Sequence, residues 1–251
     1  MSPTFSTSIA VGLSTLALLA GGCSAPTKAL ITQTRETPTG IGPGEGISVI
    51  LTRYAERDEC KDPQKEDCWA HSESEDTEKR FDRCLIRSMA QQKPTWPFVP
   101  GSEFRRLAFP GATFLDSPRS AESVMPLLDD PELQRRIAPL SVRYLVLLDV
   151  STSALNRRKT VSGASVAWTI KESWARASRL SAVVLDIQRA SRSGEISSDA
   201  SAGAGVVVPF FVIMPLPPVW WSPATESWAC ADLGKAVAEF ITGVSRPGSS
   251  D

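Results

Sequence analysis

Hydrophobic residues along this chain follow a strand pattern in four places. ISVILTRY at 47–54 is a nearly continuous apolar run, typical of a strand buried on both faces, and RYLVLLDV at 143–150 predicts a second. Further strands are expected at 164–170 and 179–189, where apolar and polar residues alternate in part. The segment SRSGE at 191–195 is then expected to turn the chain back. These segments predict a sheet at the centre of the molecule.

Apolar residues at intervals of three and four predict two amphipathic helices. The first begins at Ser74 or Asp76, either of which can act as an N-cap, and ends at Lys93-Pro94. The second begins at Ser222-Pro223 or at Thr225 and is closed by Gly243. Their apolar stripes consist of Phe81, Cys84, Leu85 and Met89 in the first helix and of Cys230, Leu233, Val237, Phe240 and Ile241 in the second.

Shorter elements complete the predicted layout. A short strand is expected at 96–99, a helical turn at 103–109 and a helix at 131–137, where Pro131 suits the first helical turn. Strand and helix therefore alternate in the first half of the chain, and antiparallel strands dominate afterwards. This order predicts an α/β fold with a mixed sheet and helices packed on it.

The N-terminus has the features of an export signal. Residues 9–20 form an uncharged apolar run, shorter than the ~20 residues that cross a bilayer. The segment LLAGGCS at 18–24 resembles the lipobox of bacterial lipoproteins. The resemblance implies that residues 1–22 are a lipoprotein signal peptide, removed before a Cys23 that carries fatty acids such as palmitate. Residues 1–8 lack the usual Lys or Arg, and an ordinary secretory peptide cut near Ala20 is the alternative.

The same resemblance implies an address and a domain order. Ser24 follows the cysteine in place of Asp, which is similar to outer-membrane sorting, so the predicted location is the outer membrane facing the periplasm. Residues 23–46 are rich in Pro and Gly and predict a flexible tether. Residues 47–243 are expected to form one α/β interaction domain, followed by a disordered tail at 244–251.

Charge is unevenly distributed although the chain as a whole carries −1. Residues 56–82 hold eleven acidic and five basic residues, whereas residues 135–192 hold eleven basic and three acidic ones. Two solvated faces that balance each other would explain this distribution. So would complementarity between neighbouring copies, or a basic face toward anionic lipid or cell-wall polymer. The near-neutral total does not favour a nucleic-acid partner.

Four cysteines lie in the predicted domain: Cys60, Cys68, Cys84 and Cys230. An exported chain with an even number favours disulfides, and three pairings are open. Cys60 and Cys68 flank a short loop and suit a local bridge, which leaves Cys84 and Cys230, each on a helical stripe. A metal site built from Cys60, Cys68, His71 and Cys84 is the competing hypothesis, without a second CxxC motif to support it. We expect neither a cofactor nor a metal ion.

The segment VVVPFFVIMPLPPVWW at 206–221 has no charge and four prolines, which exclude a membrane-spanning helix. It predicts either an edge strand that continues into a buried loop, or an exposed surface that docks a protein or contacts a membrane. Its aromatic residues are the candidate binding residues, because aromatic rings suit interfaces. They are Phe210, Phe211, Trp220 and Trp221.

Catalytic motifs are missing from the sequence. There is no GxSxG elbow, P-loop, GxGxxG or zinc-protease helix, and the single histidine, His71, lies in an acidic stretch. Asp149 and Asp186 are the one carboxylate pair that a shared cleft would suit for acid–base chemistry. The alternative is that Asp149 ends its strand while Asp186 faces solvent or pairs with an arginine. We therefore do not expect an enzyme.

A series of segments follows one order along most of residues 47–242: the buried strand at 47–54, the helix with Cys84, the segments FVP, FR and FP at 98–100, 104–105 and 109–110, the strand LSVRYLV at 140–146, the hairpin with LDI and GE at 185–187 and 194–195, and the final helix with AC and LG at 229–230 and 233–234. This order is similar to that of an uncharacterised family of proteobacterial lipoproteins. More distantly, it resembles the α/β domain of the curli-secretion lipoprotein and the N-terminal domain of the Tol periplasmic protein. The resemblance implies an interaction or assembly module.

The predicted function is that of a membrane-anchored cell-envelope lipoprotein with a non-catalytic interaction or assembly role. Its partner would be an envelope protein or a second copy of the chain. An envelope ligand-binding or hydrolytic domain is the alternative.

Radiolabelled palmitate is expected to label the parent chain but not the Cys23→Ala variant, because lipid attachment begins at the Cys23 thiol. Autoradiography of the separated envelope proteins measures the incorporation, and the variant should move into the aqueous fraction. Equal labelling of the two chains would contradict the lipobox assignment.

Overall fold

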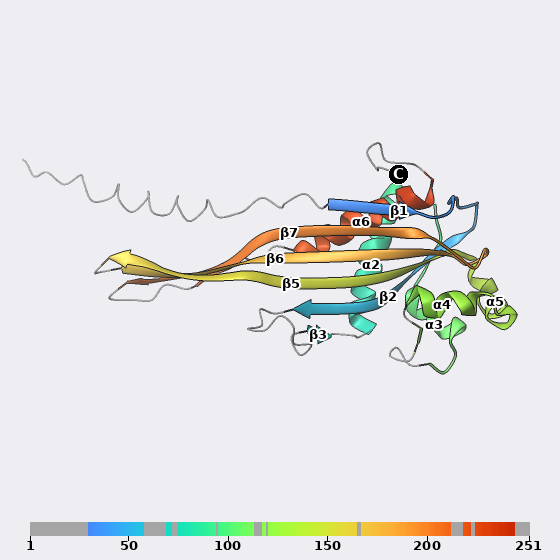
Figure 1. Ribbon diagram of the computed structural model, residues 1–251, viewed down its shortest axis with the longest axis horizontal. Helices are drawn as coiled ribbons and strands as arrows, with labels where there is room; N and C mark the ends of the chain where they lie inside the picture. Colours follow the sequence, from blue (N-terminus) through green and yellow to red (C-terminus); the bar gives the residue numbers. More distant parts are fainter. Residues whose placement is uncertain are drawn as a thin grey trace, which may run out of the picture.

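The computed structural model describes residues 30–57, 69–71, 75–93, 95–112, 117–118, 120–164, 167–211, 218–221 and 224–243. These residues form one mixed sheet with helices on both faces (Figure 1). The strands are β1 (Leu30–Arg35), β2 (Gly46–Arg57), β3 (Trp69–His71), β4 (Phe98–Val99), β5 (Val142–Ala164), β6 (Ala167–Asp186), β7 (Ser191–Phe211) and β8 (Val219–Trp221). The helices are α2 (Glu75–Gln92), α3 (Gly101–Ala108), α4 (Ala121–Leu128), α5 (Pro131–Ile137) and α6 (Thr225–Ile241), with a 3-10 turn at Ala138–Leu140.

The sheet runs in the order β1-β7-β6-β5-β2-β3, with β4 beside β2 and β8 beside β7. β2 is parallel to β5 and β4, whereas the other neighbours are antiparallel. The parallel step between β2 and β5 is crossed by helices, and the antiparallel steps from β5 to β7 need only short turns. The structure therefore confirms the predicted α/β class with a mixed sheet.

The two faces of the sheet are covered unequally. α2 and α6 pack along one face, where Val146, Leu148 and Val150 of β5 are buried in the larger core. α3, α4 and α5 cover one end of the opposite face, over Leu145 and Leu147. Figure 1 shows this second group at the right-hand end of the sheet, while β5, β6 and β7 extend far to the left.

A disulfide joins the two helices of the larger core. Cys84 of α2 and Cys230 of α6 are bonded, with their Cα atoms 6.3 Å apart across 146 residues of sequence. The helices approach closely here, since a Cβ on Gly234 would lie 2.5 Å from the Cβ of Ser88. The bond confirms one of the predicted pairings. It indicates an oxidising, extracytoplasmic compartment.

A buried ionic cluster attaches α2 and α3 to β2. Glu78 accepts the N–H of Leu51 at 3.2 Å and forms an ion pair with Arg105, whose guanidinium donates to the Leu51 carbonyl at 2.8 Å. The pairing of β2 with β5 is irregular at this point, between residues 51 and 53. The side chains of Glu78 and Arg105 thus provide hydrogen-bond partners for the buried N–H and carbonyl of Leu51, which would otherwise be unsatisfied.

Asp82 belongs to the same cluster and carries an unusual proton affinity. One carboxylate oxygen accepts the Gly101 N–H at 3.3 Å, and the other has no hydrogen-bond partner among the described residues. Burial is the main reason that the pKa of Asp82 rises from 3.8 to about 6, and the neighbouring Glu78 carboxylate adds to it. The Gly101 hydrogen bond and the Arg105 charge act in the opposite direction.

The strands after residue 140 are longer than the sequence pattern predicts. Residues 167–170 and 179–186 of the two expected segments belong to one strand, β6, and β5 continues to Ala164. The turn lies at 187–190, where Ala190 has a positive φ of 47°, because Ser191 is already paired with Asp186. The expected turn at 191–195 is therefore wrong, and α4 had no counterpart in the prediction.

Part of the predicted flexible tether belongs to the fold. Within 23–46, residues 30–35 form β1 and pair with β7 from Asp199 to Gly194. Arg35 donates to the Phe240 carbonyl at 2.9 Å, and the Tyr144 hydroxyl bonds to both backbone groups of Gly40. The Pro and Gly residues around LITQTR concealed its strand pattern. In β1 every second side chain is partly buried, and the side chains between them are exposed.

The described helices include none that is both long and apolar enough to cross a bilayer. Residues 1–29 and 244–251, predicted as signal peptide, anchor and tail, lie outside the described residues.

Removing both sulfurs with Cys84→Ala and Cys230→Ala should lower the free energy of unfolding by about 2–5 kcal/mol, because a long closed loop is released in the unfolded chain. Thermal unfolding with and without reductant measures the effect. Reductant should lower the Tm of the parent by more than that of the double variant, which keeps only the predicted local Cys60–Cys68 bridge. An identical response of the two proteins would show that the bridge does not stabilise the fold.

The Asp82→Asn variant should be more stable than the parent at pH 7, by about 1–3 kcal/mol, and equally stable near pH 4. The pKa of Asp82 lies above its ordinary value in the folded state, so its favourable contribution is present below pH 3.8 and is lost as the pH rises through about 6. Urea unfolding at both pH values measures the difference. Asp232→Asn, at an exposed position, is the control and should show no such pH dependence. An Asp82→Asn effect of equal size at both pH values would contradict the assignment.

Candidate functional site

A polar surface begins where α3, α4 and α5 end on the sheet. Along β5, the side chains on this face change from Leu145 and Leu147 to Asp149 and Ser151, while the opposite face of the strand stays apolar. β6 changes in the same place, from Val183 to Ser181 and Arg179. We call this surface the open face. Its residues are Arg53, Asp149, Ser151, Arg179, Ser181, Glu195 and Asp199.

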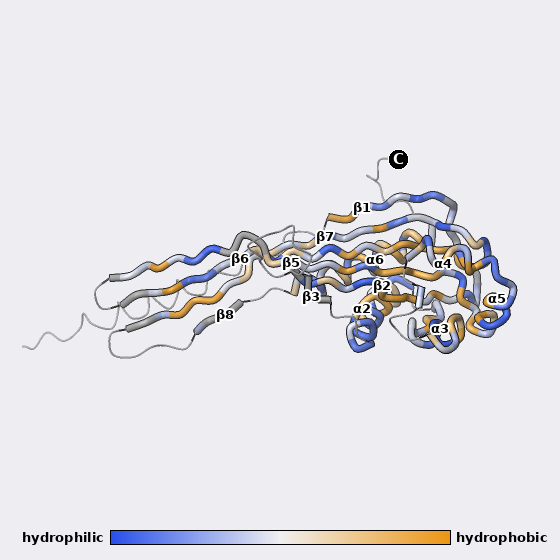
Figure 2. Tube along the Cα trace, turned by 60° about the horizontal axis from the view of Figure 1, so that its bottom comes forward, coloured by the Kyte–Doolittle hydropathy of each residue, from blue (hydrophilic) through white to orange (hydrophobic). Residues whose placement is uncertain are grey.

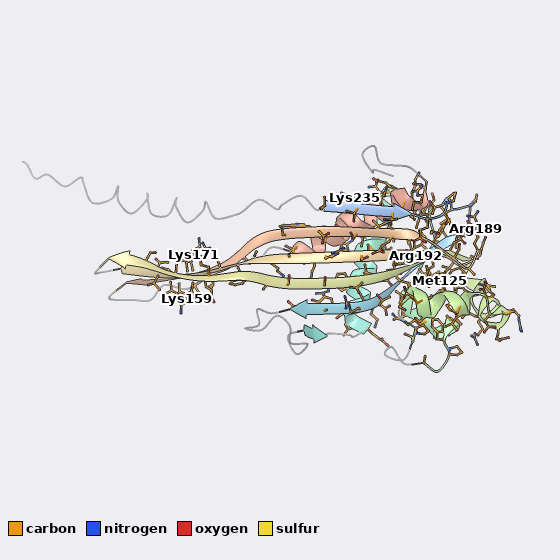
Figure 3. All side chains as sticks on the ribbon, in the orientation of Figure 1. Met125, Lys159, Lys171, Arg189, Arg192 and Lys235 are labelled. Atoms are coloured by element: carbon orange, nitrogen blue, oxygen red, sulfur yellow. A yellow bond between two sulfur atoms is a disulfide. The ribbon has the colours of Figure 1, made fainter. Side chains whose placement is uncertain are left out.

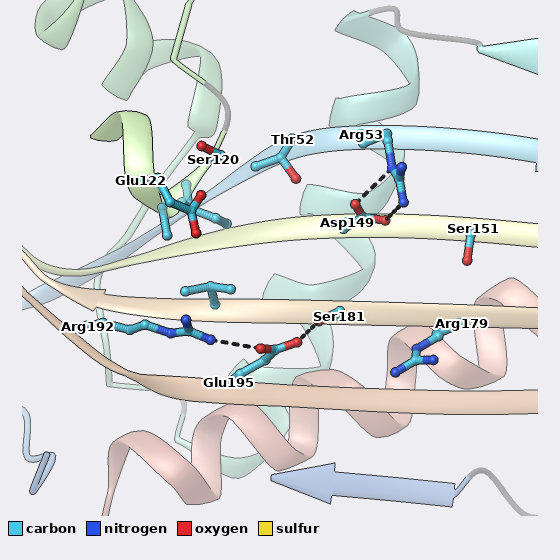
Figure 4. Close-up of a pocket in the computed structure, with 13 residues that line it drawn as sticks. Thr52, Arg53, Ser120, Glu122, Asp149, Ser151, Arg179, Ser181, Arg192 and Glu195 are labelled. Carbon is cyan, nitrogen blue, oxygen red and sulfur yellow. Dashed lines mark hydrogen bonds and ion pairs between the residues drawn. The ribbon is translucent and has the colours of Figure 1, made fainter. Parts of the chain in front are cut away.

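The open face is hollowed next to α4. A hollow of about 560 Å³ lies over β2, β5, β6 and β7, with the first residues of α4 as one wall (Figure 4). A second hollow of about 270 Å³ shares Ser151 and Arg179 with the first and reaches Asp199 and the exposed Leu30. The two hollows therefore form one concave surface across four strands and the start of β1.

Charges on the open face are arranged in pairs. Arg53 Nε lies 2.9 Å from Asp149 Oδ2, and Arg192 lies 2.8 Å from Glu195, which also accepts the Ser181 hydroxyl at 2.8 Å (Figure 4). These side chains stay accessible, since Arg53 is 56% and Asp149 38% exposed.

Arg179, 64% exposed, lies 3.8 Å from Asp199 on the neighbouring strand. Both signs of charge thus alternate with small hydroxyl side chains across the sheet. Such a surface suits recognition of a polar partner by exchange of ion pairs and hydrogen bonds.

The polar groups at the start of α4 form hydrogen bonds with one another. Ser120 caps the helix and exchanges hydrogen bonds with Ser123. Glu122 lies at the first turn, where its own backbone N–H, the Ser120 side chain and the charge of Arg192 lower its pKa. The wall contributes a carboxylate that remains ionised and is exposed to the charge of Arg192.

The predicted carboxylate pair is separated by the sheet register. Asp149 lies in the hollow and, contrary to expectation, in the middle of its strand. Asp186 is buried, pairs with Arg143 at 2.8 Å and accepts the Arg189 N–H at 3.1 Å. Asp186 is opposite Tyr144, five residues from Asp149 and thus about 17 Å along the strand. The shared acid–base cleft is therefore wrong, and the predicted arginine partner of Asp186 is confirmed.

The proposed metal set is broken by the disulfide, because Cys84 is bonded to Cys230 and cannot act as a thiolate ligand. His71 ends β3 opposite Ala55, and nothing is described of its side chain. Cys60, Cys68 and Cys23 lie outside the described residues. Within the described ranges, no three His, Cys, Asp or Glu side chains are grouped to hold a metal ion.

The four candidate aromatic residues belong to strands. Phe210 and Phe211 end β7, and Trp220 and Trp221 of β8 are opposite Val206 and Gly205. Their side chains lie outside the described part of the chain, so a binding role for them stays a prediction.

The open face has a signal in the sequence that the expected elements did not use. In β5, positions 145 to 153 read Leu, Leu, Asp, Ser, Ser at every second residue, whereas the intervening positions stay apolar until Thr152. A change of polarity on one side of a strand marks the end of the helical cover on that side. The side chains that cross strands, such as Arg53 and Glu195, need the register as well.

No protein-family model and no curated protein sequence matches this chain. Among solved structures it is similar to a PelC dodecamer from Paraburkholderia phytofirmans, with 7% identity, a TM-score of 0.32, and 86% of this chain and 97% of the other covered. A homologue of the neuraminyllactose-binding hemagglutinin from Helicobacter pylori follows, with 9% identity, a TM-score of 0.31, and 83% and 88% covered. The hypothetical protein CT253 from Chlamydia trachomatis shows 10% identity, a TM-score of 0.25, and 79% and 98% covered. A likeness of this degree carries no function over to this chain.

Proposed function

We propose that this chain is a lipid-anchored protein of the bacterial cell envelope that binds a polar protein partner through the open face, without catalysis. The observation that carries the proposal is the unequal cover of the sheet. One face is buried under two helices joined by a disulfide, whereas the other presents paired charges along β2, β5, β6 and β7.

The chemistry of the open face supports binding in preference to a reaction. Asp149 and Glu195 are each held by an arginine, and Glu195 is also held by Ser181. A carboxylate neutralised in this way is a poor base or nucleophile toward a substrate. It is a good element of a complementary interface, because a partner can compete for the arginine at small cost on an exposed surface.

Location in the envelope is supported by two independent features. The Cys84–Cys230 disulfide fits an oxidising compartment. The lipobox ending at Cys23 fits attachment to a membrane, which we propose to be the outer membrane on its periplasmic side.

A small polar ligand is the second candidate occupant. The hollow of about 560 Å³ is within the size range of ligand pockets. Most such pockets are lined by apolar and aromatic groups, whereas Ser120, Ser151 and Ser181 line this one together with the charges. A polar lining over a broad sheet favours a protein surface.

Site-specific photocrosslinking in cells tests the proposal. A photoreactive amino acid in place of Ser151 should give a discrete protein adduct, and the same residue in place of Arg87, exposed on α2, should not. Arg179→Glu should reduce the Ser151 adduct about tenfold, because it opposes the charge that the partner meets. Arg179 is exposed, so the variant should unfold at the parent's Tm.

Each alternative outcome overturns part of the proposal. Equal adducts from positions 151 and 87 would show that the open face is not the binding surface. Loss of protein adducts together with saturable binding of a small envelope component to the purified protein would favour the ligand-binding alternative.

A further inference from the structure

The far halves of β5, β6 and β7 form an arm that extends beyond the helices. We define the arm as residues 158–164, 167–175 and 204–211 of the three strands. α6 begins at the level of Ser178, to which the Thr225 hydroxyl bonds at 2.7 Å. Figure 1 shows the arm running to the left of the helical body. The arm is therefore held by strand pairing, with solvent on surfaces that the helices cover elsewhere in the sheet.

The end of the arm is apolar on one face. Val161, Ile170 and Val208 are opposite one another on three adjacent strands and thus lie on the same face. Val161 is 65% exposed, and Ile170 and Val208 are half-buried. The next row toward the tip is Gly163, Trp168 and Phe210 by register. Figure 2 shows hydrophobic colour along the arm, far from the core.

Basic residues lie just inside this apolar end. The arm contains three basic residues, Arg158, Lys159 and Lys171, and one acidic residue, Glu172. All three basic side chains are exposed. Lys159 is opposite Glu172 and Lys171 is opposite Thr160, so the two lysines stand on opposite faces at one level of the arm (Figure 3). They form a basic collar around the arm below its apolar tip.

We propose that the arm is a second membrane contact, with its apolar tip at the interface of an anionic bilayer and the collar of Arg158, Lys159 and Lys171 against lipid phosphates. A basic group near an anionic surface adds to membrane affinity, and apolar side chains enter the boundary between headgroups and acyl chains. The arm has an apolar end followed by a ring of basic groups. This order matches that of the acyl chains and the charged headgroups in a leaflet.

The length of the arm limits how deep it lies. Lys159 is five residues from Ala164, which corresponds to about 17 Å of strand. A strand needs about 9–11 residues to cross the hydrocarbon layer, so the segment beyond the collar stays in one leaflet. β2 pairs with β5 only as far as Ser153, and in the described residues the arm of β5 pairs with β6 alone. Such an open edge needs water or headgroups, which keeps the arm at the interface.

The first described residue, Leu30, lies at the end of β1 that faces the arm. β1 begins at Leu30, opposite Asp199 of β7, and runs away from the arm. The seven residues back to Cys23 span at most about 25 Å, the length over which β7 advances from Asp199 to Val206. This span is long enough for a lipid on Cys23 to reach a membrane that the arm contacts. This step rests on the lipid anchor of the proposed function.

Vesicle flotation of a lipid-free mature chain tests the arm separately from the anchor. The chain starts at Ser24 and so keeps every described residue and the disulfide. It should bind vesicles of phosphatidylglycerol and phosphatidylcholine more tightly than vesicles of phosphatidylcholine alone. Arg158→Glu with Lys159→Glu should weaken binding to the anionic vesicles by about fivefold or more for each reversed charge. Val161→Asp should weaken it about tenfold.

Matched variants on the body provide the controls. Arg83→Glu with Arg87→Glu makes the same change of net charge on the exposed side of α2, and Leu127→Asp places the same acid at another exposed apolar position. Both controls should bind like the parent. All variants should keep the parent's Tm, since Arg158, Lys159 and Val161 are exposed.

Three results would overturn the proposal: equal binding to both vesicle types, equal losses in the arm and body variants, or Val161→Asp abolishing self-association in sedimentation while vesicle binding is unchanged. The last result would assign the arm to contact between copies. No protein partner is present in the assay, so failure here is distinct from failure of binding at the open face or of palmitate labelling at Cys23.

Discussion

Pairing of β5, β6 and β7 along almost their whole length is the constraint on which the rest of the molecule depends. The three strands have 23, 20 and 21 residues and stay paired from the helical body to the tip of the arm, with one shift of the β5–β6 register between Leu155 and Arg158. α2 and α6 cover one face of the sheet in the part outside the arm, and three short helices cover only the end of the other face. A single long sheet thus provides a buried core, an open polar face and an exposed arm in succession.

The border of the larger core is marked by a polar network around Glu226, near the start of α6. This carboxylate accepts the hydroxyls of Tyr54 at 3.1 Å and Thr152 at 3.0 Å and pairs with Arg80 and Arg176. Burial, together with the neighbouring Glu226 charge, raises the pKa of Tyr54 to about 12, so the hydroxyl remains a donor. Beyond this network the same strands continue without helical cover. The ionic cluster of Glu78 and Arg105 has a similar role at β2, where it replaces strand neighbours with side chains.

The spacing of apolar residues was sufficient to predict the helices that bury one apolar stripe and the strands that bury one continuous apolar run. β2, the first half of β5, α2, α5 and α6 all lie where the spacing of apolar residues indicates, and the cysteines on two stripes meet in the disulfide. The arm part of β5 escaped because Arg158, Lys159 and Thr160 have no burial pattern, and their strand conformation comes from pairing with β6. β1 escaped for the same reason, since its register is set by β7. The open face combines residues from four strands, so its ion pairs follow from topology, which one-dimensional periodicity does not contain.

The docking of β1 also determines how the molecule responds to force. β1 pairs with β7 through six residues, and the end of the strand at Leu30 faces the arm. A pull on the chain before Leu30 in that direction acts parallel to the two strands, whereas their hydrogen bonds lie perpendicular to it. The load is then shared by the whole ladder in shear instead of opening one bond at a time. Arg35, held at the carbonyl of Phe240, carries part of that tension into α6, which makes the N-terminal strand a mechanically resistant attachment.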